Sequence, residues 1–101
     1  MSLVFKALSD PTRRKVLQLL RQKPMTAGEL ADHFAVSKPT MSAHFAVLRE
    51  ADLIDAVKQG KTITYRLKLS VLEDAWLVFA ESLGIGQPRE PVPNPLPGES
   101  P

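Results

Sequence analysis

The feature that most restricts the fold is a change of hydrophobic spacing between residues 26 and 67. The first part of this region places apolar residues at the three- and four-residue intervals of helices, and one short turn interrupts it. The second part alternates apolar and polar residues, which is the spacing of half-buried strands. Two short helices joined by a turn and followed directly by a strand pair predict a winged helix-turn-helix, a mainly α fold with one β-hairpin.

Capping residues predict where these two helices begin. Thr26 and Glu29 have the spacing of a capping box, so a helix is expected to follow Thr26. After a tight turn, Ser37 is expected to cap a longer helix over about residues 38–51. The residues expected to face inward are Leu30, Ala31 and Phe34 in the shorter helix, and Met41, Phe45 and Leu48 in the longer one.

The predicted hairpin comprises residues 53–58 and 62–67, and its second strand is rich in β-branched and aromatic residues. Gly60 lies between the strands, where a tight turn needs a residue that accepts a positive φ. Asp52 precedes the hairpin at the position where a helix usually ends in a left-handed residue. Aspartate adopts that conformation more readily than most residues do, although less readily than glycine.

Three more helices are predicted outside this region. Two precede it, over residues 1–8 and 11–21, and are separated by a capping sequence. Ser70 and Glu73 repeat the capping-box spacing, so the last helix is expected to begin after Ser70 and to stop at Gly84. The apolar residues expected on one face of each helix are Met1, Val4, Phe5 and Leu8 in the first, Val16, Leu17 and Leu20 in the second, and Leu72, Ala75, Trp76, Phe79 and Leu83 in the last.

The chain of 101 residues divides into a folded part and a tail. Residues 85–101 are rich in proline and poor in large apolar groups, so a disordered or polyproline-like tail is expected there. Residues 1–84 are expected to form one domain, whose size gives only a marginal core in a monomer. We therefore expect a homodimer held by its first and last helices, through Val4, Phe5, Leu8, Leu72, Trp76, Phe79 and Leu83.

Composition excludes several functions. The chain contains no cysteine, which rules out disulfides, thiol catalysis and sulfur-ligated metal sites. It has no apolar run of transmembrane length and no signal-peptide pattern, so no membrane insertion and a cytoplasmic location are expected. No catalytic triad, carboxylate pair or phosphate-binding glycine loop is spaced as an active site needs, so we expect no enzyme activity and no cofactor.

The predicted winged helix points to DNA as the partner. A helix fits the major groove and offers the side chains near its N-terminus to base edges, while the helix dipole favours phosphate there. The chain carries a net charge of +2, which suits a polyanionic ligand. The DNA-contacting residues expected are Ser37, Lys38, Thr40, Ser42, Ala43 and His44 on the helix, Lys58, Gly60, Lys61 and Thr62 on the hairpin, and Arg14 before them. Of these, Thr40 and His44 are expected to play no part in the helix cap.

Three stretches together resemble a known family: FKALSDPTRRKVLQLL, MTAGELADHFAVSKPTMSAHFAVLREADLI and KQGKTITYRL. They are similar to the ArsR-type winged-helix repressors, and most of all to the autorepressor branch of the sporulation-delaying toxin system. The resemblance covers about residues 3–83. It implies a homodimer joined by the first and last helices, which represses transcription by occupying a palindromic operator. It also implies recognition positions at Ser37, Lys38, Thr40, Ser42 and His44, and a wing over residues 58–62. The family usually has glycine where this chain has Asp52.

The resemblance does not by itself identify the signal that releases such a repressor from DNA. Metal-sensing members of the family usually carry a cysteine pair on the third helix, or histidine and carboxylate ligands on the last. This chain has neither set, so a metal-independent repressor is expected, released by a small molecule, by a protein co-regulator or anti-repressor, or by simple autoregulation. Two alternatives stay open: a metal site formed across the dimer from His33 and carboxylates, and a winged-helix interaction module that recruits a protein through the proline tail.

Arg13 is expected to be structural rather than DNA-binding. It lies three residues before Val16, at the edge of the buried stripe of the second helix. An ion pair with Asp10 or Glu50 is the expected arrangement. Trp76 is expected to anchor the core or the dimer interface rather than line a ligand pocket.

Overall fold

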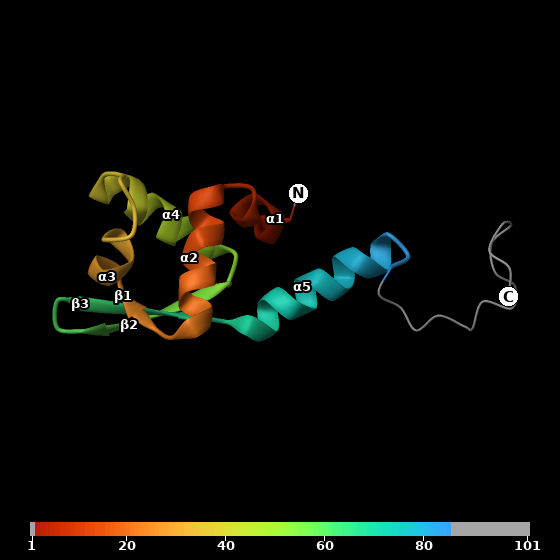
Figure 1. Ribbon diagram of the computed structural model, residues 1–101. Helices are drawn as coiled ribbons and strands as arrows, with labels where there is room; N and C mark the ends of the chain where they lie inside the picture. The colour runs from red at the N-terminus through yellow and green to blue at the C-terminus, as the bar shows by residue number, and fades with distance from the viewer. Residues whose placement is uncertain (1, 86–101) are drawn as a thin grey trace, which may run out of the picture.

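The computed structural model describes residues 2–85, which form a winged helix-turn-helix (Figure 1). Met1 and residues 86–101, which include nearly all of the expected proline-rich tail, lie outside this range. In chain order the elements are α1 (Leu3–Leu8), α2 (Pro11–Gln22), β1 (Met25–Thr26), α3 (Ala27–Ala31), α4 (Lys38–Glu50), β2 (Ile54–Gln59), β3 (Thr62–Leu67) and α5 (Leu69–Ser82).

The sheet has one strand more than the sequence predicted. β2 and β3 form the expected antiparallel hairpin, in which Ile54 pairs with Leu67 and Gln59 with Thr62. The additional strand is β1, whose Met25 pairs with Tyr65 of β3, so the strand order is β1-β3-β2. Two residues are too few to show an alternating pattern, and this strand is defined by its tertiary pairing with β3.

One core joins the helices to the sheet. α2 contributes Val16, Leu17 and Leu20, and α4 contributes Met41, Phe45 and Leu48, all as predicted. The rings of Phe45 and Tyr65 lie 4.6 Å apart between centroids, which packs α4 against the middle strand of the sheet. Burial raises the pKa of the Tyr65 hydroxyl, so this group stays protonated in the core. Phe34 packs partly buried against the same core, but it lies beyond the end of α3 rather than within it.

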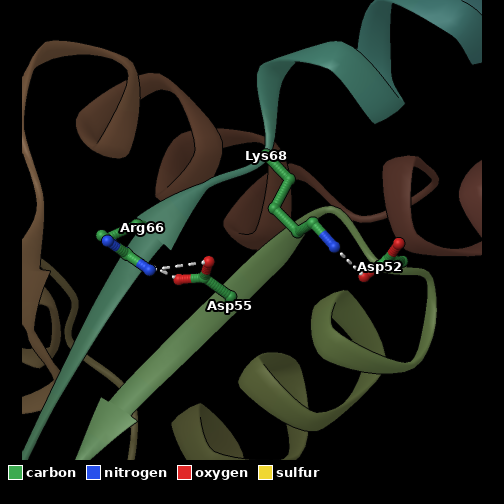
Figure 2. Close-up of polar contacts among 4 residues, drawn as sticks. All are labelled: Asp52, Asp55, Arg66 and Lys68. Carbon is green, nitrogen blue, oxygen red and sulfur yellow. Dashed lines mark hydrogen bonds and ion pairs between the residues drawn. The ribbon is translucent and has the colours of Figure 1, made fainter.

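The predicted turn residues adopt the expected backbone conformations. Asp52 has φ 61°, Gly60 at the hairpin tip has φ 61°, and Gly84 after α5 has φ 74°. Asp52 also accepts a hydrogen bond of 2.6 Å from Lys68 Nζ, which ties the turn after α4 to the start of α5 (Figure 2). Beside it, Arg66 donates to both carboxylate oxygens of Asp55 across the hairpin, at 2.9 and 3.0 Å. Both ion pairs are solvent-accessible, so each contributes little to the stability of the fold.

The helix starts agree with the sequence at α3 and differ at α5. The capping box is present at α3, where Thr26 N donates to Glu29 Oε1 at 2.9 Å and Glu29 N donates to Thr26 Oγ1 at 3.1 Å. The box predicted at Ser70 is wrong, because α5 already begins at Leu69 and no side chain caps it. Lys68, the one residue between the end of β3 and the start of α5, donates from its backbone N to Leu53 O at 2.8 Å.

The last helix projects from the rest of the domain. α5, drawn in teal and blue, points away from the end that holds α3 and the hairpin tip (Figure 1). Val71 and Leu72 near its start pack against the core, whereas Trp76 is 57% exposed and Val78 67% exposed. Among the described residues, no helix combines the length and apolar character that crossing a membrane requires.

The capping box of α3 predicts a pH dependence of stability. The backbone amide of Thr26 donates to the Glu29 carboxylate and lowers its pKa below the ordinary value. A group whose folded pKa lies below its unfolded pKa stabilises the fold above the unfolded value, and this stabilisation is lost as the pH falls through the folded value. We therefore expect the free energy of unfolding to decrease below about pH 5, and to decrease less in Glu29→Gln.

Urea unfolding of both proteins at about pH 7, 5 and 3.5 measures this difference. The carboxylates of Asp10 and Asp55 also have lowered pKa values and are common to both proteins, so part of the acid sensitivity should persist in the variant. An identical decrease in the two proteins would show that the capping box does not contribute.

Candidate nucleic-acid interface

The first turn of α4 presents polar side chains to solvent. Ser37 caps the helix: its Oγ accepts from Thr40 N at 3.3 Å and donates to Thr40 Oγ1 at 2.9 Å. Thr40 is therefore part of the cap arrangement, and the expectation that it plays no part in the cap is wrong. Ser37, Lys38 and Thr40 are all exposed, so their remaining donors and acceptors are free to meet a ligand.

The next turn separates outward from inward residues. Ser42 and Ala43 are exposed, while Met41 and Phe45 on the opposite side are buried at 1% and 4% exposure. Small outward side chains let a helix backbone approach a groove closely. The first two turns of α4 thus have the shape and polarity that a reading helix needs.

The side chain of His44 is less exposed than those of the other residues expected to contact DNA. Its side chain is half-buried, and its Nδ1 lies 3.1 Å from Arg13 Nη1 of α2. One ring nitrogen is thus turned toward the helices behind α4 rather than toward solvent. This residue has an intramolecular partner that the helical spacing alone did not reveal.

Arg13 and Arg14 both bond to the end of α1. Arg13 Nε donates to Ala7 O at 2.8 Å, and its Nη2 donates to Lys6 O at 2.9 Å. Arg14 Nη1 donates to Leu8 O at 2.7 Å. The side-chain ion pair expected between Arg13 and Asp10 or Glu50 is wrong, since among the described residues the Arg13 guanidinium bonds to these carbonyls and to His44 instead.

Asp10 acts as the N-cap of α2. Its Oδ1 accepts from Thr12 N at 2.7 Å and from Arg13 N at 3.2 Å. Burial raises the pKa of Asp10, but these amide hydrogen bonds and the nearby Arg13 guanidinium lower it by more, so the net pKa lies below the ordinary value. The carboxylate is therefore charged at neutral pH, and it holds the start of α2.

The hairpin tip lies on the same side of the domain as the start of α4. Lys58, Gly60, Lys61 and Thr62 are all exposed there. Ala27 and Gly28 of α3 line a hollow with Lys61 and Thr62, and they line a second hollow with Lys38 and Ser42 of α4. The first turn of α3 is thus flanked by the hairpin tip and the start of α4, at the end of the molecule opposite α5 (Figure 1). The three lysines of this end favour a polyanion.

A second surface is formed by α1 and α5. Phe5 packs edge-on against Phe79 with centroids 5.0 Å apart, and Phe79 lies 6.2 Å from Trp76. Phe5 is 40% exposed and Leu83 is 59% exposed, so this face is apolar and uncovered in a single chain. Of the other residues expected at a dimer interface, Val4, Leu8 and Leu72 pack against the core of their own chain.

Sequence spacing missed two exposed apolar residues of α5. Leu77 and Val78 are 57% and 67% exposed, although neither belongs to the apolar stripe expected for the last helix. α5 is apolar around much of its circumference, and this could have been noticed from the sequence VLEDAWLVFA. An exposed helix that is apolar on more than one side indicates a partner surface.

Metal ligands are sparse in the part of the chain that the structure covers. Between residues 2 and 85 no three histidine or carboxylate side chains come together closely enough to hold a metal ion. One open hollow at the end of α2 is lined by His33, Glu29, Asp32 and Lys23, among others.

Comparison with known proteins identifies relatives for nearly the whole described region. A helix-turn-helix domain family matches residues 8–57. The chain is 48% identical over 80 residues to the transcriptional repressor SdpR of Bacillus subtilis, which covers 77% of this chain and 89% of that protein. It is 35% identical over 74 residues to the arsenical resistance operon repressor of Staphylococcus aureus, which covers 73% of this chain and 71% of that protein.

Solved structures agree with these relatives. An ArsR-like transcriptional regulator from Rhodococcus sp. RHA1 matches with a TM-score of 0.70 and 33% identity, which covers 81% of this chain and 76% of that chain. This match shows that the similarity includes the spatial arrangement of the helices and the hairpin as well as the sequence.

The Ser37 cap predicts different costs for two neighbouring substitutions. Ser37→Ala removes the acceptor of the Thr40 amide and should lower the free energy of unfolding by about 1 kcal/mol. Thr40→Ala removes one exposed hydroxyl contact and leaves the cap bond, so it should cost less than half as much. Urea unfolding of the two variants and the parent measures the difference. Equal costs would show that the serine is not the cap on which the helix start depends.

Proposed function

Because this chain belongs to the ArsR family of winged helix-turn-helix transcriptional repressors, we propose that it represses transcription as a homodimer bound to a palindromic operator. The observation that carries the proposal is the polar, lysine-bearing end of the domain, where the first turn of α4 and the hairpin tip flank α3. A reading helix and a basic wing on one side can contact base edges and phosphates of the same duplex.

The proposed roles follow from exposure and chemistry. Ser37, Thr40 and Ser42 have exposed hydroxyls that suit base edges and nearby phosphates, and Lys38 adds a positive charge at the start of the helix. Lys58, Lys61 and Thr62 flank Gly60 at the wing tip, where they suit the phosphate backbone. Arg14 donates to Leu8 O with one nitrogen, and its remaining donors suit a phosphate.

The proposed dimer uses the face of α1 and α5. The exposed side chains of Phe5, Trp76, Val78 and Leu83 provide the apolar area that a second copy would cover. A two-fold axis through this face presents two α4 helices, so the operator should be an inverted repeat with half-sites about one helical turn, roughly 34 Å, apart.

The proposed repressor acts in the cytoplasm and carries no catalytic activity. The absence of cysteine argues for release without a sulfur-ligated metal. We propose release by a small molecule or by a protein co-regulator or anti-repressor, or control by autoregulation alone.

Selection of bound sequences from random duplexes, followed by footprinting, tests the proposal. We expect an inverted repeat and an affinity that falls steeply with salt. Divalent metals added to the same assay separate a metal-responsive repressor from a metal-independent one. Binding with no sequence preference, or no binding, would overturn the proposal and favour a winged-helix module that binds protein.

The wing lysines predict a sequence-independent loss of affinity. Lys58→Ala and Lys61→Ala each remove one charge and should weaken binding to operator and random DNA alike. Each should flatten the slope of log affinity against log salt by up to about one unit. Lys68→Ala is a matched control, because Lys68 pairs with Asp52 at the root of the hairpin. A changed base preference with an intact salt slope would place these lysines at bases instead.

Trp76 predicts a loss of association without a comparable loss of folding. It is 57% exposed in a single chain, so Trp76→Ala should change the stability of a protomer little and weaken the dimer at least tenfold. Sedimentation at micromolar concentration measures association. Val36→Ala is the control, because Val36 is 41% exposed but lies in the turn before α4. Sedimentation of the parent as an 11.1 kDa monomer would contradict the dimer.

A further inference from the structure

We infer that Arg13 is the positioning residue that couples α1 to the reading helix α4, so that one side chain sets the angle between the dimer face and the DNA-contacting face. This inference rests on the proposed function. It assigns a role in half-site spacing to a residue that is not itself expected to contact DNA.

The geometry that carries the inference is a three-point contact. The Arg13 guanidinium donates through Nε to Ala7 O at 2.8 Å and through Nη2 to Lys6 O at 2.9 Å, both in the last turn of α1. Its remaining terminal nitrogen, Nη1, lies 3.1 Å from His44 Nδ1 on α4. One planar group from α2 therefore touches the two helices on either side of it.

The chemistry of each partner matches a guanidinium. The carbonyls at the end of a helix carry partial negative charge and lack helical partners, and a cation there is favourable. A guanidinium cannot give up its proton to accept a bond, so Arg13 is the donor toward His44. Nδ1 is then the acceptor, and the ring proton of neutral His44 resides on Nε2.

The contact joins the two proposed functional faces. Phe5 of α1 packs against Phe79 of α5 on the proposed dimer surface. His44 lies in the second turn of α4, between the proposed DNA-contacting residues and the core residue Phe45. A rotation of α4 relative to α1 would break at least one of the three bonds of Arg13. In a dimer, such a rotation changes the separation of the two reading helices.

Arg14 provides a natural contrast. It is the neighbouring arginine on α2 and donates to Leu8 O, again at the end of α1, at 2.7 Å. None of its hydrogen bonds within the described residues reaches α4. Arg14→Gln therefore removes the same charge and a bond to the same helix while leaving the connection between α1 and α4 intact.

The first experiment needs no DNA. The ring nitrogen chemical shifts of His44, measured by NMR in the full chain, report which nitrogen carries the proton, and exposed His33 is an internal reference. We expect the Nε2–H form for His44 in the parent and in Arg14→Gln. We expect a shift toward the mixed tautomers of a free imidazole in Arg13→Gln and Arg13→Lys. Unchanged His44 signals in both Arg13 variants would overturn the contact.

The second experiment measures half-site spacing. Operators from the selection are compared with versions lengthened or shortened by one and two base pairs between the half-sites. The parent should discriminate among the spacings. Arg14→Gln loses a proposed phosphate contact, so it should bind every spacing more weakly and with a flatter salt slope, but it should keep the discrimination of the parent. Arg13→Lys should reduce this discrimination by about tenfold, with the salt slope unchanged. A reduced salt slope with spacing discrimination intact would identify Arg13 as a phosphate contact and overturn the inference.

A second variant keeps the test valid if Arg13 is also needed for folding. His44→Leu removes the acceptor and should reduce spacing discrimination similarly, and Arg13→Lys should add little in that background. Independent, additive effects of the two substitutions would overturn the coupling. If the parent protein selects no operator but the NMR result holds, the proposed function and the role of Arg13 in half-site spacing are both overturned. The Arg13–His44 contact would then be purely structural.

Discussion

The contact between Phe45 of α4 and Tyr65 of β3 connects the two elements that are proposed to touch DNA. Both side chains are buried, and their ring centroids lie 4.6 Å apart. Tyr65 also pairs in register with Met25 of β1 and Ala56 of β2, so the middle strand transmits this contact to the whole sheet. Because close-packed cores deform little, α4 and the hairpin keep one relative orientation, and in the proposed complex a DNA duplex would meet both as one rigid surface.

The features that sequence could predict are those with local causes. Thr26 and Glu29 accept hydrogen bonds from each other's backbone amides within one turn, and Ser37 caps α4 through an amide three residues further on. Asp52 and Gly60 adopt the positive φ that their turns require. The spacing of the α4 core residues follows from helix geometry alone. The family and its fold were recognisable for the same reason, since these short signals occur in one fixed order. The DNA-contacting positions themselves stay predictions.

Features that depend on tertiary contacts could not be predicted. β1 exists because Met25 pairs with Tyr65, and α5 begins at Leu69 without any side-chain cap, directly after Lys68 N bonds to Leu53 O. The prediction that Arg13 lies at the edge of the core is confirmed, whereas the predicted ion-pair partners are wrong. The charge of Arg13 favours an ion pair when only the sequence is considered. In the structure the guanidinium bonds instead to backbone carbonyls at the end of α1, whose position the sequence does not reveal.

The apolar face of α5 has a consequence for the amount of protein in a cell. A copy that has not formed the proposed dimer exposes Trp76 and Val78 to water, and such surfaces attract chaperones, proteases and other exposed chains. Newly made chains at low concentration would be removed faster than paired ones. Turnover would then rise as dilution breaks the pairs, and the level of active repressor would respond to synthesis rate more steeply than in direct proportion.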